Sequence, residues 1–247
     1  MRKQKERNSI VIIVAYVVLG IISFMCIAPV VLMAVASFTD NDVLNLYGYT
    51  YFPQKWSLEA YEFLIKQGTV ISKSFLNSIL VTFMGTALGI MVTVLLAYTI
   101  SRKELVGRKL IMLFVFFTML FNGGMVPTYL MYTQIFHIKN TMWALLFPHL
   151  LVNGFNVLLV RTFFNENIPE VLLEAARIDG AGEISIFRNV VLPISKPILA
   201  TIGLLVGVGY WNDWYNGLLF VTDVNYYTLQ NFLNKIMTDL PVSYTHL

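Results

Sequence analysis

Charged residues are scarce in this sequence. Only 13% of its 247 residues are Asp, Glu, Lys or Arg, whereas 57% are hydrophobic, and the mean hydropathy is +0.69. A soluble domain usually carries about 25% charged residues. This small number of charged residues cannot form a polar surface on all sides of the protein. The composition therefore excludes an ordinary soluble protein. The formal net charge of +3 gives no indication of nucleic acid as a partner.

Residue types that usually carry chemistry are also rare. Cys26 is the only cysteine and lies in an apolar run, which excludes a disulfide framework and a thiolate metal site. The three histidines form no His-Glu-x-x-His motif, and the phosphate-binding pattern Gly-x-x-x-x-Gly-Lys-Ser/Thr does not occur. The sequence therefore predicts no catalytic residue, no metal site and no cofactor bound by this chain. A membrane-embedded enzyme is a minor alternative, because no intramembrane serine is matched to a histidine by helical spacing.

Long stretches of the sequence contain no charge at all. No Asp, Glu, Lys or Arg occurs in 8–39, 74–101, 110–138 or 140–160, and 197–222 contains only Asp213. Each stretch exceeds the roughly 20 residues that cross a bilayer core of about 30 Å. We therefore predict five transmembrane helices, at about residues 10–37, 75–100, 110–131, 140–160 and 197–221.

The first of these stretches has a second interpretation. A basic N-terminus precedes it, and Ala34-Val35-Ala36 is similar to a signal-peptide cleavage site. The apolar part of a signal peptide has about 7–15 residues, however, and this stretch is about twice as long. We therefore prefer an uncleaved first transmembrane helix.

The basic residues are distributed unevenly among the connections. Twelve of the seventeen Lys and Arg residues fall in 1–8, 101–109 and 161–196, and five fall in the other connections. Basic residues concentrate in cytoplasmic loops. We therefore predict a cytoplasmic N-terminus, a cytoplasmic 161–196 connection, and an external connection over 38–73 that lies on the membrane interface.

The 161–196 connection has local signals for two short helices. Pro169 suits the first turn of a helix and Gly180 can end it, which predicts a helix over 169–179. A second helix follows and is expected to close at Pro193. At helical spacing, one apolar face is formed in the first helix by Val171, Ala175 and Ile178, and in the second by Ile184, Phe187 and Val191. The pair is either a compact knob that another protein approaches closely or a hairpin lying on the membrane.

One pattern in this connection resembles a known family. Glu174-Ala175-Ala176, then Gly180 after three residues, and Val190-x-Leu192-Pro193 after nine more, is similar to the EAA loop of ABC importer permeases, with Val190 in place of isoleucine. The resemblance implies an all-α polytopic helical bundle, the transmembrane domain of a type I ABC importer, as a single domain over 1–241. It also implies a set of ATPase-coupling residues, namely Glu174, Ala175, Ala176, Asp179, Gly180, Ala181, Phe187, Leu192 and Pro193.

Other short sequence motifs indicate which branch of this family the chain resembles. The string from Glu174 to Ala181, with Leu192-Pro-Ile-Ser-Lys-Pro197, is similar to maltose-type carbohydrate permeases. Phe121-Asn-Gly-Gly-Met-Val-Pro127 and Trp211-Asn-Asp-Trp214 resemble oligosaccharide and polysaccharide permeases of Gram-positive bacteria. This resemblance implies import of a sugar or oligosaccharide by alternating access, in a bacterial plasma membrane. A permease for another solute class is the alternative.

The resemblance also implies partners and a sixth helix. The partners are a cytoplasmic ABC ATPase dimer that holds ATP and Mg²⁺, a second homologous permease, an extracellular solute-binding lipoprotein and membrane lipid. Members of the family usually have six transmembrane helices, and no sixth apolar run occurs here. We therefore expect that the sixth is truncated and that 242–247 is an atypical tail.

Two groups of residues inside apolar runs are candidates for contact with the solute. Asn122, Gly123 and Gly124 interrupt the third run, and broken helices often line a transport path, although a plain turn is equally consistent. Asn153 and Asn156 in the fourth run suit a solute hydroxyl or, as we favour, hydrogen bonds between helices.

A third group lies at the end of the fifth run. Trp211, Asn212, Asp213 and Trp214 combine aromatic rings with amide and carboxylate groups, which suits a sugar. Aromatic residues at the end of a transmembrane helix are also ordinary interface anchors, the interpretation that we favour here.

Overall fold

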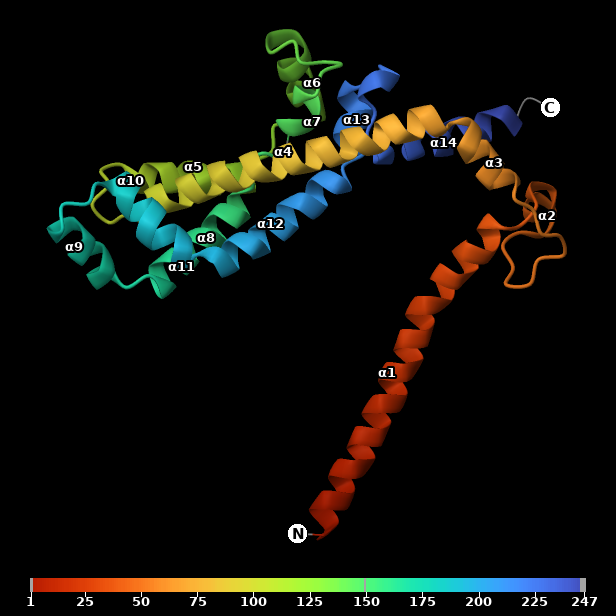
Figure 1. Cartoon of the computed structure of the whole chain (residues 1–247), viewed down its shortest axis with the longest axis horizontal. Coiled ribbons are helices and arrows are strands. Elements are labelled where there is room, and N and C mark those ends of the chain that lie inside the picture. The colour runs from red at the N-terminus through yellow and green to blue at the C-terminus, as the bar shows by residue number, and fades with distance from the viewer. Residues whose placement is uncertain (1, 149, 245–247) are drawn as a thin grey trace. The chain divides into compact units, whose positions relative to one another are not determined.

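The computed structural model describes residues 2–148 and 150–244, with side chains described over 12–148 and 150–238. Most of the chain is helical, as predicted for an all-α bundle (Figure 1). It divides into two compact units, residues 1–69 and 70–247, where the sequence predicts a single domain over 1–241.

The first unit contains one long apolar helix and two short ones. α1 (Arg2–Ser37) continues through Pro29, and its part from Ile12 to Ser37 is long and apolar enough to cross a membrane. Apolar side chains are exposed along this part, which is typical of a membrane-spanning helix. α2 (Asn41–Tyr47) and α3 (Glu59–Lys66) lie within the predicted external connection.

Asp40 organises the segment that follows α1. Its Oδ1 accepts a hydrogen bond from the backbone N–H of Asp42 at 3.1 Å and so caps α2. Its Oδ2 lies 2.6 Å from Lys55 Nζ, and this contact lowers the pKa of the Asp40 carboxyl. An antiparallel bridge between Thr39 and Trp56 closes the same loop.

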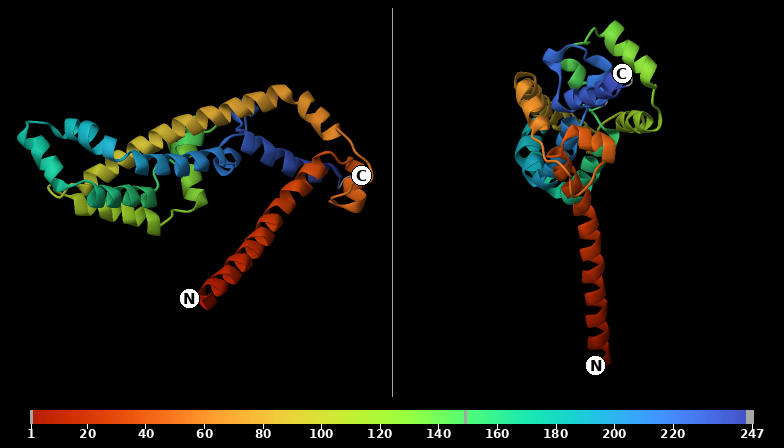
Figure 2. Two further views of the ribbon diagram at one scale, coloured as in Figure 1. Left: turned by 60° about the horizontal axis from the view of Figure 1, so that its bottom comes forward. Right: turned by 90° about the vertical axis from the view of Figure 1, so that its right-hand side faces the viewer.

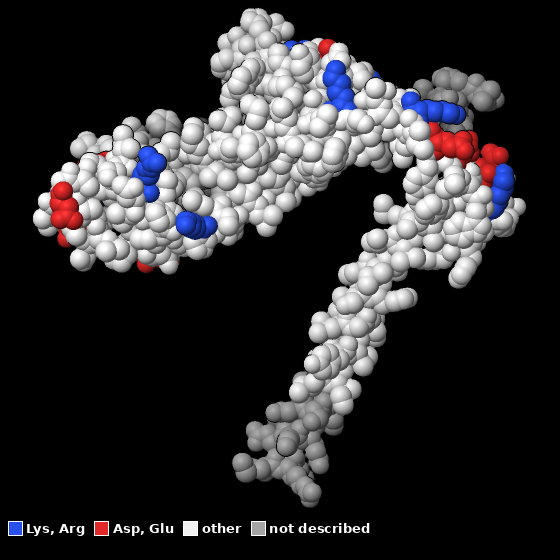
Figure 3. Space-filling view, viewed as in Figure 1, with Lys and Arg blue, Asp and Glu red and all other residues white. Residues whose placement is uncertain are grey.

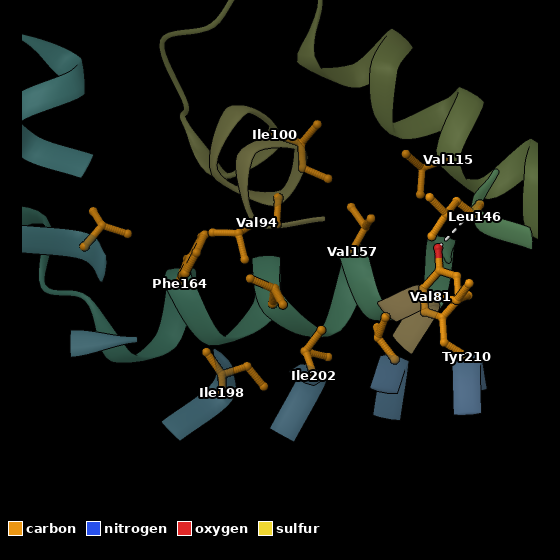
Figure 4. Packing of buried hydrophobic residues seen from close by; sticks show 14 of the residues in the cluster. Val81, Val94, Ile100, Val115, Leu146, Val157, Phe164, Ile198, Ile202 and Tyr210 are labelled. Atoms are coloured by element: carbon orange, nitrogen blue, oxygen red, sulfur yellow. Dashed lines mark hydrogen bonds between the residues drawn. The ribbon is translucent and has the colours of Figure 1, made fainter. Parts of the chain in front are cut away.

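The core of the second unit lies between three helices. α4 (Gly68–Ser101), α8 (Gly154–Asn167) and α12 (Lys196–Trp211) contribute the buried side chains Val94, Ile100, Val157, Phe164, Ile198 and Ile202 (Figure 4). Tyr210 of α12 is buried beside them and donates its hydroxyl hydrogen to the backbone carbonyl of Leu146 at 2.8 Å. In lipid, such close packing and hydrogen bonding hold helices together, because burial from water contributes little.

Glycines allow α4 and α12 to approach closely. A Cβ atom at Gly85 would lie 2.5 Å from Tyr210 Cζ, and one at Gly89 would lie 3.1 Å from Val206 Cγ1. Small residues at such contacts are typical of membrane helix bundles. The two helices could not keep this separation with larger residues at these positions.

The third apolar run forms a broken helix. α5 (Arg108–Leu120) ends before Asn122, and α6 (Met125–Leu130) continues into the π-helical turn η1 (Met131–Ile135). The two parts meet at an angle of 115°. The predicted helix over 110–131, interrupted near 121–127, is therefore two helices separated by residues 121–124.

The fourth apolar run differs more from the prediction. Over 140–160 we predicted one helix, but the structure has α7 (Trp143–Leu146), a non-helical segment, and α8, which begins at Gly154. Pro148 accounts for the first break, because proline cannot continue a helix interior. Asn153 caps α8 by accepting hydrogen bonds from the N–H groups of Phe155 and Asn156. His149 lies outside the described residues.

Two described helices are individually long and apolar enough to cross a membrane, and up to four if each bent pair is one span. The sequence predicts five. Part of the difference arises in the fourth run, whose absence of charge does not depend on whether the backbone is one helix. The predicted helix over 197–221 also differs, because α12 ends at Trp211 and is long enough to cross a membrane only together with Glu183–Ile194.

A short helix and a longer bent element follow α8. α9 (Glu170–Ile178) comes first; then α10 (Glu183–Ile186), the π-helical turn η2 (Phe187–Val191) and α11 (Leu192–Ile194) run on without a break. α12 begins at Lys196, at 80° to them. The prediction that the second short helix closes at Pro193 is confirmed to within one residue, because the element ends at Ile194 and the chain bends at Ser195.

Two groups of elements lie at opposite ends of α4 in the second unit (Figures 1 and 2). α13 (Tyr215–Phe220), the turn η3 (Val224–Tyr226) and α14 (Leu229–Tyr244) lie near its N-terminal end, where Lys73 Nζ donates a hydrogen bond to Asn225 Oδ1 at 2.7 Å. α9 and α10 lie near its C-terminal end. We did not predict α14, which reaches into the expected tail over 242–247.

Candidate coupling site

α9 is defined at both ends by local chemistry. Pro169 precedes its first residue, and Glu170 places a carboxylate at its positive N-terminal end. At the other end Gly180 has a φ of +81°, which glycine adopts readily and other residues do not. The N–H of Ala181 donates to the Ala176 carbonyl at 2.9 Å and completes the turn. The predicted helix over 169–179 is confirmed, with bounds of Glu170–Ile178.

Contacts between charged and aromatic side chains hold α9 and α10 against the C-terminal end of α4. Arg177 of α9 binds Glu104 in the loop after α4, with 2.8 Å between Nη1 and Oε1. It also binds Glu183 of α10, with 2.9 Å between Nη2 and Oε1. Tyr98 of α4 donates its hydroxyl hydrogen to Glu183 Oε2 at 2.6 Å, and its ring centroid lies 4.8 Å from that of Phe187.

These contacts stabilise the ionised carboxylates. The hydrogen bond from Arg177 lowers the pKa of Glu104. The pKa of Glu183 is lowered chiefly by the hydrogen bond from Tyr98; burial opposes this effect, and the hydrogen bond from Arg177 lowers the pKa further. Both carboxylates therefore stay charged, and the network stays intact, well below neutral pH.

The opposite face of α9 is open. Leu173 is buried against the bundle, whereas Val171 is 72% exposed and Ile178 is 86% exposed. Ala175 and Glu174 are exposed on the same helix. This arrangement agrees with the predicted apolar face of Val171, Ala175 and Ile178, and it presents that face outward.

The predicted second apolar face does not form as expected. Ile184 is 85% exposed, whereas Val191 is buried and Phe187 is half-buried. The π-helical turn over Phe187–Val191 adds residues per turn, so side chains beyond it rotate away from the register of α10. Ile184 is therefore exposed, as Ile178 is, whereas Val191 is part of the core.

The remaining predicted coupling residues fall into two groups. Those exposed at the surface are Asp179, Gly180 and Pro193, and those half-buried against the bundle are Ala176, Ala181, Phe187 and Leu192. On the face shown in Figure 3, charged atoms gather at the end of the second unit that carries α9 and α10, next to an uncharged length of α4 and α12.

The candidates for solute contact have local structural roles. Asn122 Oδ1 accepts a hydrogen bond from the N–H of Gly124 at 2.9 Å, and Gly124 has a φ of +84°, which together form a turn. Gly123 lies in the same exposed turn. Asn153 is the cap of α8 rather than a link between helices, and Asn156 is buried.

The group at the end of α12 forms the turn into α13. Asn212 Nδ2 donates to the Val208 carbonyl at 2.9 Å, and Asp213 Oδ1 accepts from the N–H of Asn216 at 3.2 Å. Trp211 and Trp214 lie on either side of this turn, at the end of α12 and just before α13.

Several residues of the coupling site were not predicted. Tyr98, Glu104 and Glu183 connect α9 to α4 and to the loop after it, and no motif in the sequence marks any of the three. Asn216 is also buried, and its Nδ2 donates to the Pro148 carbonyl at 2.9 Å. In the part of the chain that the structure describes, no three His, Cys, Asp or Glu side chains are close enough to hold a metal.

Comparison with known proteins agrees with this architecture. The family model described as binding-protein-dependent transport system inner membrane component matches residues 85–241, which include α9 to α11. The polygalacturonan/rhamnogalacturonan transport system permease protein YtcP of Bacillus subtilis (strain 168) is 36% identical over 231 residues, covering 94% of this chain and 79% of that protein. The trehalose/maltose transport system permease protein MalG of Thermococcus litoralis is 31% identical over 224 residues, covering 90% and 78%.

A solved structure extends the agreement to three dimensions. A chain of the crystal structure of a bacterial ABC transporter involved in the import of the acidic polysaccharide alginate superimposes with a TM-score of 0.82 at 29% identity, covering 92% of this chain and 80% of that chain. The family match covers more than half of the sequence, and the structural match covers nearly all of it. This chain therefore belongs to the binding-protein-dependent transport system inner membrane components, the membrane permease subunits of ABC importers.

Proposed function

We propose that this chain translocates a sugar or oligosaccharide through a bacterial plasma membrane, driven by a separate cytoplasmic ATPase dimer that docks on α9. The observation that supports this most is the open apolar face of α9. Ile178 and Val171 are largely exposed although the same helix is fixed to the bundle through Arg177. An exposed apolar face on a fixed helix suits a protein partner.

The coupling mechanism follows from how α9 is attached. Arg177 joins α9 to Glu104 and Glu183, and Tyr98 joins Glu183 to α4. A movement that the ATPase imposes on α9 is therefore transmitted to α4. ATP and Mg²⁺ stay on the ATPase, and the membrane helices alternate between inward and outward states.

Glu174 and Gly180 have distinct proposed roles. Glu174 is exposed on α9 and offers a carboxylate to a basic residue of the ATPase. A Cβ added at Gly180 would meet nothing within 4 Å, so this surface is open to an approaching partner. Small residues allow that partner to come close to the backbone.

We also propose an orientation, further partners and a cellular location for this chain. We infer a cytoplasmic N-terminus from the distribution of basic residues. A second homologous permease completes the translocation path, and an extracellular solute-binding lipoprotein delivers the sugar. We assign the plasma membrane of a Gram-positive bacterium, because similar permeases come from Bacillus.

The proposal that the solute is a carbohydrate rests on the similar proteins. Permeases similar to this chain carry names that refer to polygalacturonan, trehalose or maltose, and the solved transporter imports alginate. Uptake of labelled oligosaccharides from each class by cells carrying the whole transporter tests the assignment. Uptake of a non-carbohydrate solute alone would reject it.

The docking proposal is tested with a charge placed on the open face of α9. Ile178→Asp in the assembled transporter should release the ATPase during purification and lower sugar uptake at least tenfold. Val106→Asp is the matched control, because Val106 is 96% exposed in the loop after α4. Retention of the ATPase and full uptake by the Ile178 variant would refute docking at α9.

A further inference from the structure

A polar cleft opens beside the coupling site, at the C-terminal end of α4. It has a volume of about 650 Å³ and is bordered by the loop after α4, by α8 and by the start of α9. Its charged lining comprises the basic residues Arg102, Lys103, Arg108, Arg161 and Arg177 and the acidic residues Glu104, Glu166 and Glu170. Basic side chains thus outnumber acidic ones, and of these charged residues the coupling mechanism uses only Arg177 and Glu104.

Two of the basic residues are neutralised by neighbours. Lys103 Nζ lies 2.7 Å from Glu170 Oε2, and Arg177 binds Glu104. Among the carboxylates that line the cleft, only Glu166 forms no ion pair with a described residue. The charges of the paired groups therefore cancel, and the remaining three arginines outnumber Glu166 in the cleft.

These three arginines form no hydrogen bond to a carboxylate within the described part of the chain. Arg161 donates from Nε to the Ile100 carbonyl at 3.4 Å. The Nε of Arg102 is buried without a hydrogen-bond partner, although it forms a long ion pair with Glu183, with 3.8 Å between Nε and Oε2, and the guanidinium lies 4.2 Å from the centroid of the Tyr98 ring. Arg108 is half-buried and contacts no described carboxylate. The guanidinium groups of Arg108 and Arg161 are thus partly removed from water without a described carboxylate partner, which favours binding an anion.

The same three arginines lie where charge-free runs end. Arg102 directly follows the run over 74–101, Arg161 directly follows the run over 140–160, and Arg108 precedes the run that starts at residue 110. The ends of such runs lie at the depth of lipid headgroups. The uncapped N-terminus of α5 at Gly107 adds positive potential at Arg108.

We propose that this cleft binds the phosphate of an anionic phospholipid from the adjacent leaflet. Arginine presents a planar fork that matches two phosphate oxygens, and basic pockets between membrane helices suit such headgroups. The depth of the arginines favours a lipid over a soluble phosphate compound. The proposal requires only that the chain spans a membrane, so it is independent of the sugar and of ATPase docking.

Lipid retention by the purified full chain tests the proposal. The chain is purified in neutral detergent with phosphatidylglycerol or with phosphatidylcholine of the same acyl chains, and native mass spectrometry counts the lipids that remain bound. We expect selective retention of phosphatidylglycerol, weakened about fivefold for each arginine removed. The test variants are Arg108→Gln and the double variant Arg102→Gln/Arg161→Gln.

A charge-matched control separates the cleft from the rest of the basic surface. Lys109→Gln/Arg188→Gln removes two exposed basic residues that do not line the cleft, and it should keep the lipid. If the double variant in the cleft elutes as an aggregate, Arg108→Gln decides, because Arg108 has no ion pair to lose within the described residues.

Three results would overturn the proposal. One is equal retention of phosphatidylglycerol and phosphatidylcholine by the unchanged chain. Another is an equal loss of lipid in the cleft variants and in the control. The last is displacement by millimolar inorganic phosphate without any preference for phosphatidylglycerol, which would assign the cleft to a soluble phosphate compound instead.

Discussion

The Arg177 guanidinium on α9 binds the Glu104 carboxylate beyond the end of α4, with 2.8 Å between Nη1 and Oε1. The same guanidinium reaches Glu183 on α10 at 2.9 Å. One side chain thus joins three segments that are separate in sequence. The proposed coupling role requires α9 to move together with the membrane helices, so this side chain is the first target for mutation.

Arg177→Gln should weaken coupling more than folding. The variant loses both ion pairs, so α9 can move without α4, while the exposed position makes the effect on stability small. We expect sugar-stimulated ATP hydrolysis and uptake to fall by about tenfold, with basal ATP hydrolysis retained. Arg188→Gln, an exposed residue of η2, should change neither. If both variants transport at the parent rate, the network has no coupling role.

The attachment of α9 should be lost in acid. The pKa values of Glu104 and Glu183 are lowered in the folded chain, so their ion pairs stabilise it above the ordinary glutamate pKa of about 4.3 and cease to do so as the pH falls through the lowered values. Spin labels on Ala175→Cys and Val106→Cys, with Cys26 replaced, should report a constant separation from pH 7 to about 5 and a change below. A smaller change is expected with Glu104→Gln. A change already complete near pH 6 would contradict the assignment.

A bulky residue at Gly180 should block the ATPase. Gly180 and Gly107 both have positive φ, +81° and +87°, and a Cβ at either would meet nothing within 4 Å. Tryptophan at either site therefore carries a similar backbone cost of about 1–2 kcal/mol. We expect Gly180→Trp, and not Gly107→Trp, to lower recovery of the ATPase and sugar uptake. Equal recovery with both variants would leave α9 a plain surface helix.

Gly85→Ala should destabilise the contact between α4 and α12. Its Cβ would lie 2.5 Å from Tyr210 Cζ, and the ring is held by its hydrogen bond to the Leu146 carbonyl. We expect a loss of about 1–3 kcal/mol, seen as a lower Tm in detergent. Gly20→Ala on α1 is the control, because its Cβ would meet nothing within 4 Å. An unchanged Tm for Gly85→Ala would mean that the helices separate without cost.

The orientation can be tested by labelling with an impermeant maleimide on intact cells. In a chain with Cys26 replaced, Phe52→Cys should react, because Phe52 is 92% exposed in the connection that we place outside. Ile184 is 85% exposed in the connection that we place inside, and Ile184→Cys should react only after the membrane is opened. Reaction of Ile184→Cys in intact cells would invert the topology.

The sequence by itself determined the class of the protein and the position of α9. Absence of charge over about 20 residues is enough to place a segment in lipid. Pro169 and Gly180 define the ends of α9 through neighbours in the chain alone. These signals depend on local chemistry, so they could be read without knowing how the helices pack.

Tertiary structure decided which residues meet. Charge is equally absent from a straight helix and from a broken one, so the break between α7 and α8 and the capping role of Asn153 could not be deduced from the run over 140–160. The π-helical turn over Phe187–Val191, which separates Ile184 from Val191, has no sequence signal of its own. Arg102, Arg108 and Arg161 came to line one cleft only because the packing of α4, α5 and α8 brings distant parts of the chain together.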